Sequence, residues 1–304
     1  MKISNYDEYG YDYKTYWNNR DYEDHAEKVF LKKELKNRKG NWFIDIGGSF
    51  GRNLPVYYSQ FDNPVIIDYS LETLQKNNDG IKKDYPNTHL IAANAYNLPF
   101  KDKTFDGGVM IRVLHHIESP DQYFKEISRA MNGKATYIQE IANKVHFKAN
   151  IRNMLIGNRS FFTEEPYQQP SQGNFEGTEG ESTIFLNFHP NHIKKLLNEN
   201  GFKIIRLQGV SFFRIPFIKK FFPISVLTAA ETLTQKLFRG KYFAPSIFIS
   251  TTKDDAQDKS PNKLEDILVC PICKGDLKFS KETATCTSCN KTFEKKKNIW
   301  DFRV

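Results

Sequence analysis

Residues 41–70 constrain the fold of this chain more than any other segment. An apolar run at residues 42–44 leads to Asp45 and a glycine-rich turn, after which a helix is expected. A second apolar run at residues 65–67 then ends at Asp68. Strand, glycine turn, helix, strand and terminal acid is the plan of a nucleoside-binding half of a doubly wound sheet. We therefore predict an α/β fold with a Rossmann-like, mostly parallel sheet.

The glycine turn narrows the choice of nucleoside. A dinucleotide site expects the spacing GxGxxG, with the pyrophosphate at the start of the helix. Here an acid precedes the first glycine, and the order is Asp45, Gly47, Gly48, Ser49 and Gly51. A carboxylate at that position would repel a diphosphate but would accept hydrogen bonds from the ammonium group of a ligand. The pattern therefore disfavours a dinucleotide.

Further segments follow the turn in a fixed order. They are residues 91–100, IAANAYNLPF, residues 105–117, FDGGVMIRVLHHI, and residues 200–202, NGF, before a late apolar run. Together with the turn, they resemble the DxGxGxG, GDAxxLPF, FDxVxxxxxLHH and aGF motifs of class I (type 11) S-adenosylmethionine (SAM)-dependent methyltransferases. The resemblance covers roughly residues 15–250 and implies a methyltransferase fold, SAM as cofactor and methyl transfer as the reaction.

The resemblance also assigns the cofactor site. It implies that the glycine turn surrounds the methionine part, that Asp68 takes the ribose with Tyr69 beside it, and that Asn94 and Ala95 lie at the adenine. Arg112 is expected to face the methionine carboxylate or the acceptor, or to be a surface ion-pair partner. The expected cofactor-binding residues are Asp45, Gly47, Gly48, Ser49, Gly51, Asp68, Tyr69, Asn94, Ala95, Arg112, Tyr16 and Arg20.

Tyr16 and Arg20, with Trp17 as a third cap candidate, belong to an aromatic-rich N-terminal segment, residues 1–22, which in this class often folds over the cofactor as a cap. A flexible tail with anchors in the core is the alternative. Two residues depart from the family pattern. Ser49 stands where the family has its second glycine, and Asn94 replaces an Asp, so it keeps an acceptor oxygen and loses the charge.

Methyl transfer from a sulfonium needs alignment, exclusion of water and, for a protonated acceptor, a base. His189, Glu140 and His115 are the candidate bases, with His116 also considered. A histidine at such a position is also often a packing or helix-capping group. Because no NPPY-type motif is present, methylation of an amide or of an exocyclic amine is disfavoured.

All four cysteines lie near the C-terminal end, in two CxxC pairs: Cys270, Cys273, Cys286 and Cys289. Thiolates at this spacing close a tetrahedron around Zn²⁺, and two disulfides are the alternative. The tail from residue 263 to residue 304 resembles the zinc-ribbon activator subunit of tRNA and translation-factor methyltransferases, fused here in cis. By that resemblance the ribbon is expected to support the catalytic domain by covering apolar surface.

The formal net charge of +8 is unevenly spread. Residues 212–241 carry six basic side chains against Glu231 alone, interleaved with six phenylalanines. Such a basic aromatic arm suits anionic lipid headgroups or RNA phosphates. Alternatively, its rings pack on the sheet while its lysines stay in water.

The chain is expected to divide into a methyltransferase domain at residues 1–252, a charged linker at 253–262 and a zinc ribbon at 263–304. Residues 157–189 form a polar, glycine-rich insertion expected to be a lid. With no signal peptide and no long apolar run, a cytoplasmic location is expected, with peripheral contact to an anionic membrane left open.

The interpretation that these features favour is SAM-dependent methyl transfer to a small or lipid-linked acceptor. An RNA methyltransferase is the first alternative, suggested by the ribbon and a pI near 9.1. A non-catalytic binding module that keeps the fold is the second, suggested by Ser49 and Asn94.

Overall fold

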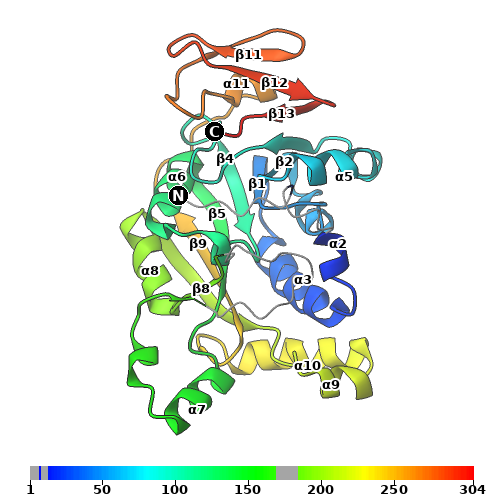
Figure 1. Ribbon diagram of the computed structural model, residues 1–304. Coiled ribbons are helices and arrows are strands. Elements are labelled where there is room, and N and C mark those ends of the chain that lie inside the picture. Colours follow the sequence, from blue (N-terminus) through cyan, green and yellow to red (C-terminus); the bar gives the residue numbers. More distant parts are fainter. Residues whose placement is uncertain (1–6, 8–12, 169–183) are drawn as a thin grey trace.

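The computed structural model describes residues 7, 13–168 and 184–304 (Figure 1). Residues 1–6 and 8–12 of the expected cap and residues 169–183 of the expected lid lie outside the described residues. Within the described part, no helix combines the length and the apolar character needed to cross a bilayer.

The centre of the molecule is a doubly wound sheet. Its strands are β1 (Gly40–Ile46), β2 (Phe61–Asp68), β3 (His89–Ala92), β4 (Phe105–Met110), β5 (Met131–Ala142), β8 (Phe202–Val210) and β9 (Ser246–Lys253). The spatial order is β3-β2-β1-β4-β5-β9-β8, and only β9 pairs antiparallel, with both β5 and β8. The predicted α/β, mostly parallel fold is confirmed.

Helices cover both faces of this sheet (Figure 1). They are α2 (Tyr13–Tyr16), α3 (Asp21–Leu35), α4 (Leu54–Tyr57), α5 (Leu71–Asp84), α6 (Pro120–Ala130), α7 (Phe147–Leu155), α8 (Pro190–Glu199), α9 (Pro216–Phe221) and α10 (Ile224–Leu237), with short 3₁₀ turns η1 (Leu114–His116) and η2 (Arg159–Phe162). A two-stranded ladder joins β6 (Tyr167–Gln168) to β7 (Leu186–Asn187).

The core has two layers because side chains alternate along each strand. On β1, Trp42 and Ile44 belong to the core beneath α6 and α8, whereas Phe43 belongs to the core beneath α3, α4 and α5. The side chains of both layers are almost fully buried. The middle of β1, residues 42–44, is therefore apolar towards both layers, as expected for a central parallel strand.

The C-terminal ribbon continues the same sheet. It consists of α11 (Leu264–Ile267), β10 (Leu277–Phe279), β11 (Thr283–Cys286), β12 (Thr292–Lys296) and β13 (Ile299–Asp301). β13 pairs parallel with β3, with Trp300 opposite Ile91, and the Phe302 amide donates to the Ala92 carbonyl at 2.8 Å. Trp300 and Phe302 are buried in the core that holds Trp42, so ribbon and sheet share one apolar interior.

The linker lies along the sheet in an ordered path. The Trp42 indole donates to the Pro261 carbonyl, and Asn132 both donates to the Asp258 carbonyl and accepts from the Asp258 amide. Gly133 has no room for a side chain, because a Cβ there would lie 2.1 Å from the Ala256 carbonyl oxygen. The charged composition of residues 253–262 gave no sign of this packing, and the predicted division into separate domains stays a prediction.

Candidate cofactor site and cysteine cluster

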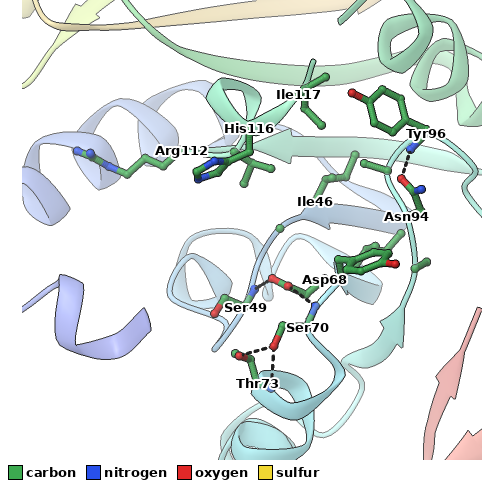
Figure 2. A pocket seen from close by; sticks show the side chains of 16 residues that line it. Ile46, Ser49, Asp68, Ser70, Thr73, Asn94, Tyr96, Arg112, His116 and Ile117 are labelled. Carbon is green, nitrogen blue, oxygen red and sulfur yellow. Dashed lines mark hydrogen bonds between the residues drawn. The ribbon is translucent and has the colours of Figure 1, made fainter. Parts of the chain in front are cut away.

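A crevice opens at the carboxyl ends of β1, β2 and β4, where doubly wound sheets bind ligands. Figure 2 shows Ser49, Asp68, Ser70 and Thr73 on one side and His116 and Ile117 on the other, with Ile46 between them. The remaining wall is made by Gly47, Ile67, Tyr69, Ala93, Asn94, Ala95, Tyr96, Arg112 and Val113. Six predicted cofactor residues besides Asp68 therefore line it: Gly47, Ser49, Tyr69, Asn94, Ala95 and Arg112.

The glycine turn brings backbone close to this crevice. Gly47, Ser49 and Gly51 have φ values of 68°, 48° and 76°, so Ser49 holds a left-handed conformation that suits glycine. A Cβ on Gly47 would lie 2.3 Å from Val113. The departure from glycine at position 49 is thus accommodated, at the cost of backbone strain.

Asp68 is presented by two backbone donors. The amide of Ser49 donates to Oδ2 at 3.0 Å and the amide of Ser70 donates to Oδ1 at 2.9 Å. Burial nevertheless raises the pKa of Asp68 to about 6, against the lowering effect of these amides. Each oxygen carries a second lone pair, so the carboxylate suits a ribose diol that donates two hydrogen bonds.

Asp45 lies beneath the turn and does not line the crevice. It is buried, accepts from the Tyr57 hydroxyl at 2.8 Å, and its Cγ would lie 2.9 Å from a Cβ on Gly48. Burial raises the pKa of Asp45 to about 7, although the Tyr57 hydrogen bond lowers it. Its negative charge becomes favourable when a cation approaches the turn.

The far end of the crevice suits a flat apolar ring. Ile67, Ala93 and Ile117 line it, and Asn94 accepts from the Tyr96 amide at 3.0 Å (Figure 2). Tyr96 is held in turn by the Ser119 amide, which donates to its hydroxyl at 3.1 Å. The Asn94 carbonyl oxygen therefore shapes the turn at the adenine end.

A second, smaller cavity continues from the glycine turn towards the N-terminal segment. It is lined by Trp17, Gly47, Gly48, Ser49, Phe50, Arg52, Asn53 and Ile111. Three buried polar atoms there have no hydrogen-bond partner: Trp17 Nε1, Ser49 Oγ and Asn53 Oδ1. Because such atoms are normally satisfied, they indicate a polar ligand group. A donor, a hydroxyl and an acceptor fit the carboxylate and the ammonium of the methionine part of SAM.

Buried ion pairs hold this end in place. Glu27 accepts from Arg112 Nε at 2.7 Å and from Arg52 Nη2 at 2.7 Å, and Arg52 also pairs with Asp24 at 2.7 Å. Burial alone would raise the pKa of Glu27, but the two arginines hold it below its usual value. The Arg52 guanidinium lies 3.8 Å from the Trp17 ring centroid, which fixes Trp17 over the turn.

The other cap candidates lie beside this cluster rather than on the crevice wall. The Tyr16 hydroxyl accepts from Arg112 Nη1 at 3.3 Å, and the Arg20 guanidinium stacks 4.1 Å from the Tyr16 ring centroid. Sequence reasoning missed Arg52, Asn53 and Tyr96. The sequence signal for Arg52 and Asn53 was their position directly after Gly51.

The candidate bases occupy different places. Glu140 is buried behind Arg112, accepting from the Arg112 amide at 2.9 Å and from the Ser246 hydroxyl. His189 is the N-cap of α8, where its Nδ1 accepts from the Asn191 amide at 3.1 Å. Neither is among the residues that line the crevice, so their candidacy as bases stays a prediction made from sequence alone.

The paired histidines lie closer to the crevice. His115 stacks on Phe185 with centroids 4.2 Å apart, and His116 lines the crevice itself. Burial lowers the pKa of His116 to about 4 and that of His115 well below its usual value, so both rings are neutral near pH 7. Nδ1 of His116 lies 2.9 Å from the Ile184 carbonyl, which accepts its proton and leaves Nε2 as the basic nitrogen.

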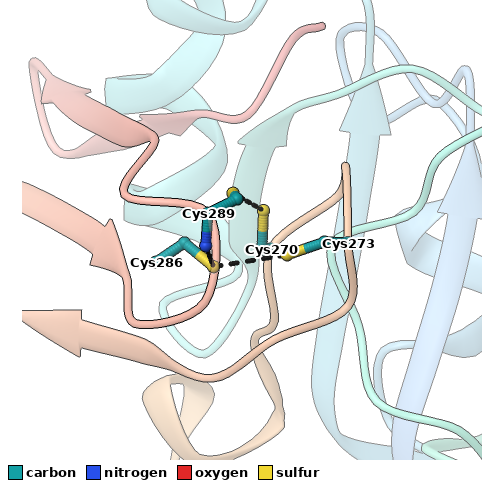
Figure 3. A group of neighbouring side chains, drawn as sticks. All are labelled: Cys270, Cys273, Cys286 and Cys289. Carbon is teal, nitrogen blue, oxygen red and sulfur yellow. Dashed lines mark hydrogen bonds between the residues drawn. The ribbon is translucent and has the colours of Figure 1, made fainter.

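The four cysteines of the ribbon converge on one point (Figure 3). Their Sγ atoms all lie within 4.8 Å of one another, with Cys270 and Cys289 3.7 Å apart and Cys273 and Cys286 3.4 Å apart. A disulfide would need about 2.05 Å, whereas tetrahedral Zn–S bonds of about 2.3 Å give sulfur pairs near 3.8 Å. The cysteines are free thiols, and their arrangement fits a tetrahedral metal ion.

Comparisons with known proteins agree with this site. Residues 44–138 match a family model described as a methyltransferase domain. The uncharacterized protein MJ1252 of Methanocaldococcus jannaschii is 28% identical over 200 residues, which cover 64% of this chain and 73% of the relative. MJ0638 of the same organism is 34% identical over 119 residues, covering 38% and 46% respectively.

Solved structures share the fold. A SAM-dependent methyltransferase of Thermotoga maritima has a TM-score of 0.53 at 16% identity, covering 79% of this chain and 94% of that chain. A chain from the Haloferax volcanii complex of a methyltransferase with the Trm112 activator has a TM-score of 0.53 at 12% identity, covering 80% and 96%. Residues 44–138 therefore match a methyltransferase domain, and the chain shares the fold of a solved SAM-dependent methyltransferase, with a crevice whose residues fit SAM.

Proposed function

We propose that this methyltransferase acts on a small or lipid-linked acceptor. The observation that carries the proposal is the character of the crevice beyond the cofactor residues: its wall there consists of Val113 and the neutral imidazole of His116. Such a wall favours an uncharged or apolar acceptor group and excludes water from the reacting atoms.

SAM supplies an activated methyl group: a bond forms from the acceptor atom to the methyl carbon while the bond from carbon to sulfur breaks. The protein then has to align the acceptor and take up its proton, if it has one. Nε2 is the unprotonated nitrogen of His116 in the tautomer that the Ile184 carbonyl selects, and the ring lies on the crevice wall, where burial lowers its pKa to about 4 and makes it a weak base. We therefore place His116 ahead of His115, Glu140 and His189 as the group that accepts this proton.

An RNA acceptor receives less support from the charges around the crevice. RNA tracking needs arginine and lysine side chains directed at phosphates. Arg52 and Arg112 are instead paired with Glu27, and Arg303 is paired with Asp301. These guanidinium charges are already balanced by carboxylates.

We further propose that the four cysteines hold one structural Zn²⁺ with no open coordination position. All four sulfurs are taken up by the tetrahedron, so the ion would cross-link the ribbon rather than take part in the reaction. Metal analysis should return one zinc per chain, and Cys273→Ser should make residues 264–304 exchange amide hydrogens before the rest of the chain. Protein lacking zinc, or isolated with two disulfides, would contradict this assignment.

The acceptor class is tested with methyl-labelled SAM. Purified protein is incubated separately with the lipid, small-molecule and RNA fractions of a cell extract, with Asp68→Ala as the control that removes cofactor binding. Label should appear in the lipid or small-molecule fraction and disappear with the control. Label found in the RNA fraction alone would overturn the proposal. Titration of SAM in the same preparations distinguishes loss of cofactor binding from a wrong acceptor class.

A further inference from the structure

Three helices, α7, α9 and α10, lie at the end of the molecule opposite the ribbon (Figure 1). They expose apolar side chains. Of the 20 large hydrophobic side chains that are exposed in the described part of the chain, 17 lie in residues 147–167 and 215–243. Scattered exposed hydrophobics are normal, but a concentration of this kind marks an interaction site. We call residues 147–167 and 215–243 the apolar end surface.

The orientation of α10 is the reverse of that of an ordinary surface helix. A surface helix normally turns its apolar stripe to the core and its charges to water. The buried stripe of α10 is instead Leu227, Glu231 and Gln235. Its exposed large apolar side chains are Ile224, Val226, Leu233 and Leu237, with Leu237 67% exposed.

Glu231 explains why α10 is held this way round. Its carboxylate accepts from the Tyr22 hydroxyl at 2.5 Å, from the Ser211 amide at 2.8 Å and from Gln235 at 3.0 Å. This buried hydrogen-bond network fixes the polar stripe against α3 and the end of β8. The acidic side chain of the helix is therefore removed from the surface, and the apolar side chains remain outside.

The helices α7 and α9 also leave apolar side chains exposed. The buried residue of α7 is Asn153, whereas Met154 and Leu155 are 70% and 83% exposed. α9 buries no residue, and its Phe217 and Phe221 rings lie 4.5 Å apart on the outside.

Contacts join these helices into one surface. The Phe147 amide, at the start of α7, donates to the Phe243 carbonyl at 3.0 Å. The Phe243 ring also lies 5.7 Å from that of Phe238, which follows α10. The apolar end surface is thus continuous from α7 to the end of α10.

The exposed charges on this surface are mostly basic. They are Lys148, Arg152, Arg159, Lys220, Lys236, Arg239 and Lys241, with Glu164 and Glu165 between the two helical parts. Lys219 does not belong to this set, because its ammonium pairs at 2.8 Å with the buried Glu23. Aliphatic and aromatic side chains with lysines and arginines among them form the pattern of helices that lie in a membrane interface.

We propose that the apolar end surface docks the enzyme on an anionic lipid bilayer. Its basic side chains complement phospholipid headgroups, and its Leu, Ile, Met and Phe side chains reach the acyl boundary. A second copy of the chain fits less well, because a two-fold contact would bring the same basic residues together. RNA fits less well because nine of the 17 exposed apolar side chains are aliphatic and offer no stacking surface for bases. The surface is independent of the acceptor proposed above.

Sedimentation with vesicles tests the docking. The full-length protein should bind phosphatidylcholine vesicles that contain phosphatidylglycerol, and binding should weaken as salt rises. Because each lysine near such a surface contributes about 1 kcal/mol, Lys220→Glu with Lys241→Glu should weaken binding about tenfold or more at low salt. The matched control is Lys278→Glu with Lys281→Glu, which changes the charge equally on the ribbon and should leave binding intact.

The apolar part is tested separately. Met154→Ser with Leu155→Ser should weaken vesicle binding equally at low and high salt, since apolar burial is not screened, while the melting temperature stays unchanged because both side chains are exposed. Leu155→Trp fluorescence should be quenched by brominated lipid, and that of the control Ile205→Trp should not. Absence of vesicle binding at low salt overturns the proposal. The proposal is also overturned if neither double variant changes vesicle binding. It is overturned as well if the sole effect of these variants is a loss of dimer mass or a loss of RNA binding.

Discussion

Arg303, two residues beyond the last strand of the ribbon, donates from Nη1 to Asp7 Oδ2 at 3.0 Å and to the Tyr69 carbonyl at 3.3 Å. Asp7 in turn accepts from the Ser70 hydroxyl and from the Leu71 amide at the start of α5. Asp7 and Arg303 therefore meet beside Asp68, at the rim of the cofactor crevice. The ribbon reaches the site through one side chain as well as through the shared sheet.

Arg303→Ala should therefore weaken SAM binding without unfolding the ribbon. The ion pair is partly exposed, so we expect a two- to fivefold loss of affinity, about 0.5–1 kcal/mol. Lys296→Ala is the matched control, because Lys296 also pairs with Asp301, at 3.1 Å, whereas Arg303 pairs with both Asp301 and Asp7. Isothermal titration of both variants measures the difference. Equal affinity in the two variants would show that the contact has no effect on the cofactor site.

Affinity for SAM should fall as the pH is lowered through about 6, the pKa of Asp68. The ribose hydroxyls donate to the ionised carboxylate, so protonation removes an acceptor, and each further pH unit lowers the affinity by up to about tenfold. Titrations between pH 5 and 8 check the profile. In Asp68→Asn the inflection near 6 should vanish, leaving a slope from Asp45, whose pKa is about 7. An unchanged profile in that variant would exclude Asp68 as the titrating group.

Asp45 should destabilise the cofactor-free protein at alkaline pH. Its folded pKa, about 7, exceeds the usual value of 3.8. The stability contributed by the protonated carboxyl is therefore complete below pH 3.8 and is lost as the pH rises to about 7. Asp45→Asn should gain on the order of 2–4 kcal/mol over the parent between pH 4 and pH 8. Urea unfolding at both pH values measures this difference. A gain of equal size at both would point to packing rather than to charge.

Ser49→Gly should stabilise the cofactor-free protein and weaken SAM binding. Relief of the left-handed backbone at φ 48° is worth about 1 kcal/mol, partly offset by the flexibility of glycine in the unfolded chain. The loss of Oγ, which is buried without a partner, removes a hydrogen bond to the methionine part. Ser49→Ala separates the two effects, since it keeps the strain and loses only the hydroxyl. Thermal unfolding and SAM titration give the two values, and tighter SAM binding in Ser49→Gly would contradict the role of Oγ.

Local spacing predicted the cofactor crevice well, because a strand, a glycine turn and a terminal acid are close in the sequence. Gly47 and Asp68 therefore line it as expected. Arg52 could not be placed, because its position depends on Glu27 and Asp24 of α3, which no local pattern links to the turn. The packing of residues 258 and 261 could not be predicted for the same reason, since their partners Asn132 and Trp42 are on distant strands.

The basic aromatic arm shows a related limit. Its composition indicated phenylalanines and lysines but not which of them face the protein. Phe217, Phe221 and Phe222 are exposed, against the packing alternative, whereas Lys219 is held by Glu23. The orientation of α10 in this arm is set by Glu231, whose partners Tyr22 and Ser211 lie far from it in the chain.

The pairing of β13 with β3 also bears on solubility. Without the ribbon, β3 would be the open edge of a parallel sheet, with the backbone of Ile91 and Ala92 available to a strand of another molecule. The opposite edge strand, β8, is guarded by Lys203 and Arg206, whereas β3 consists of His89, Leu90, Ile91 and Ala92. Any treatment that melts the ribbon, including removal of a metal ion, should therefore first appear as self-association through this edge.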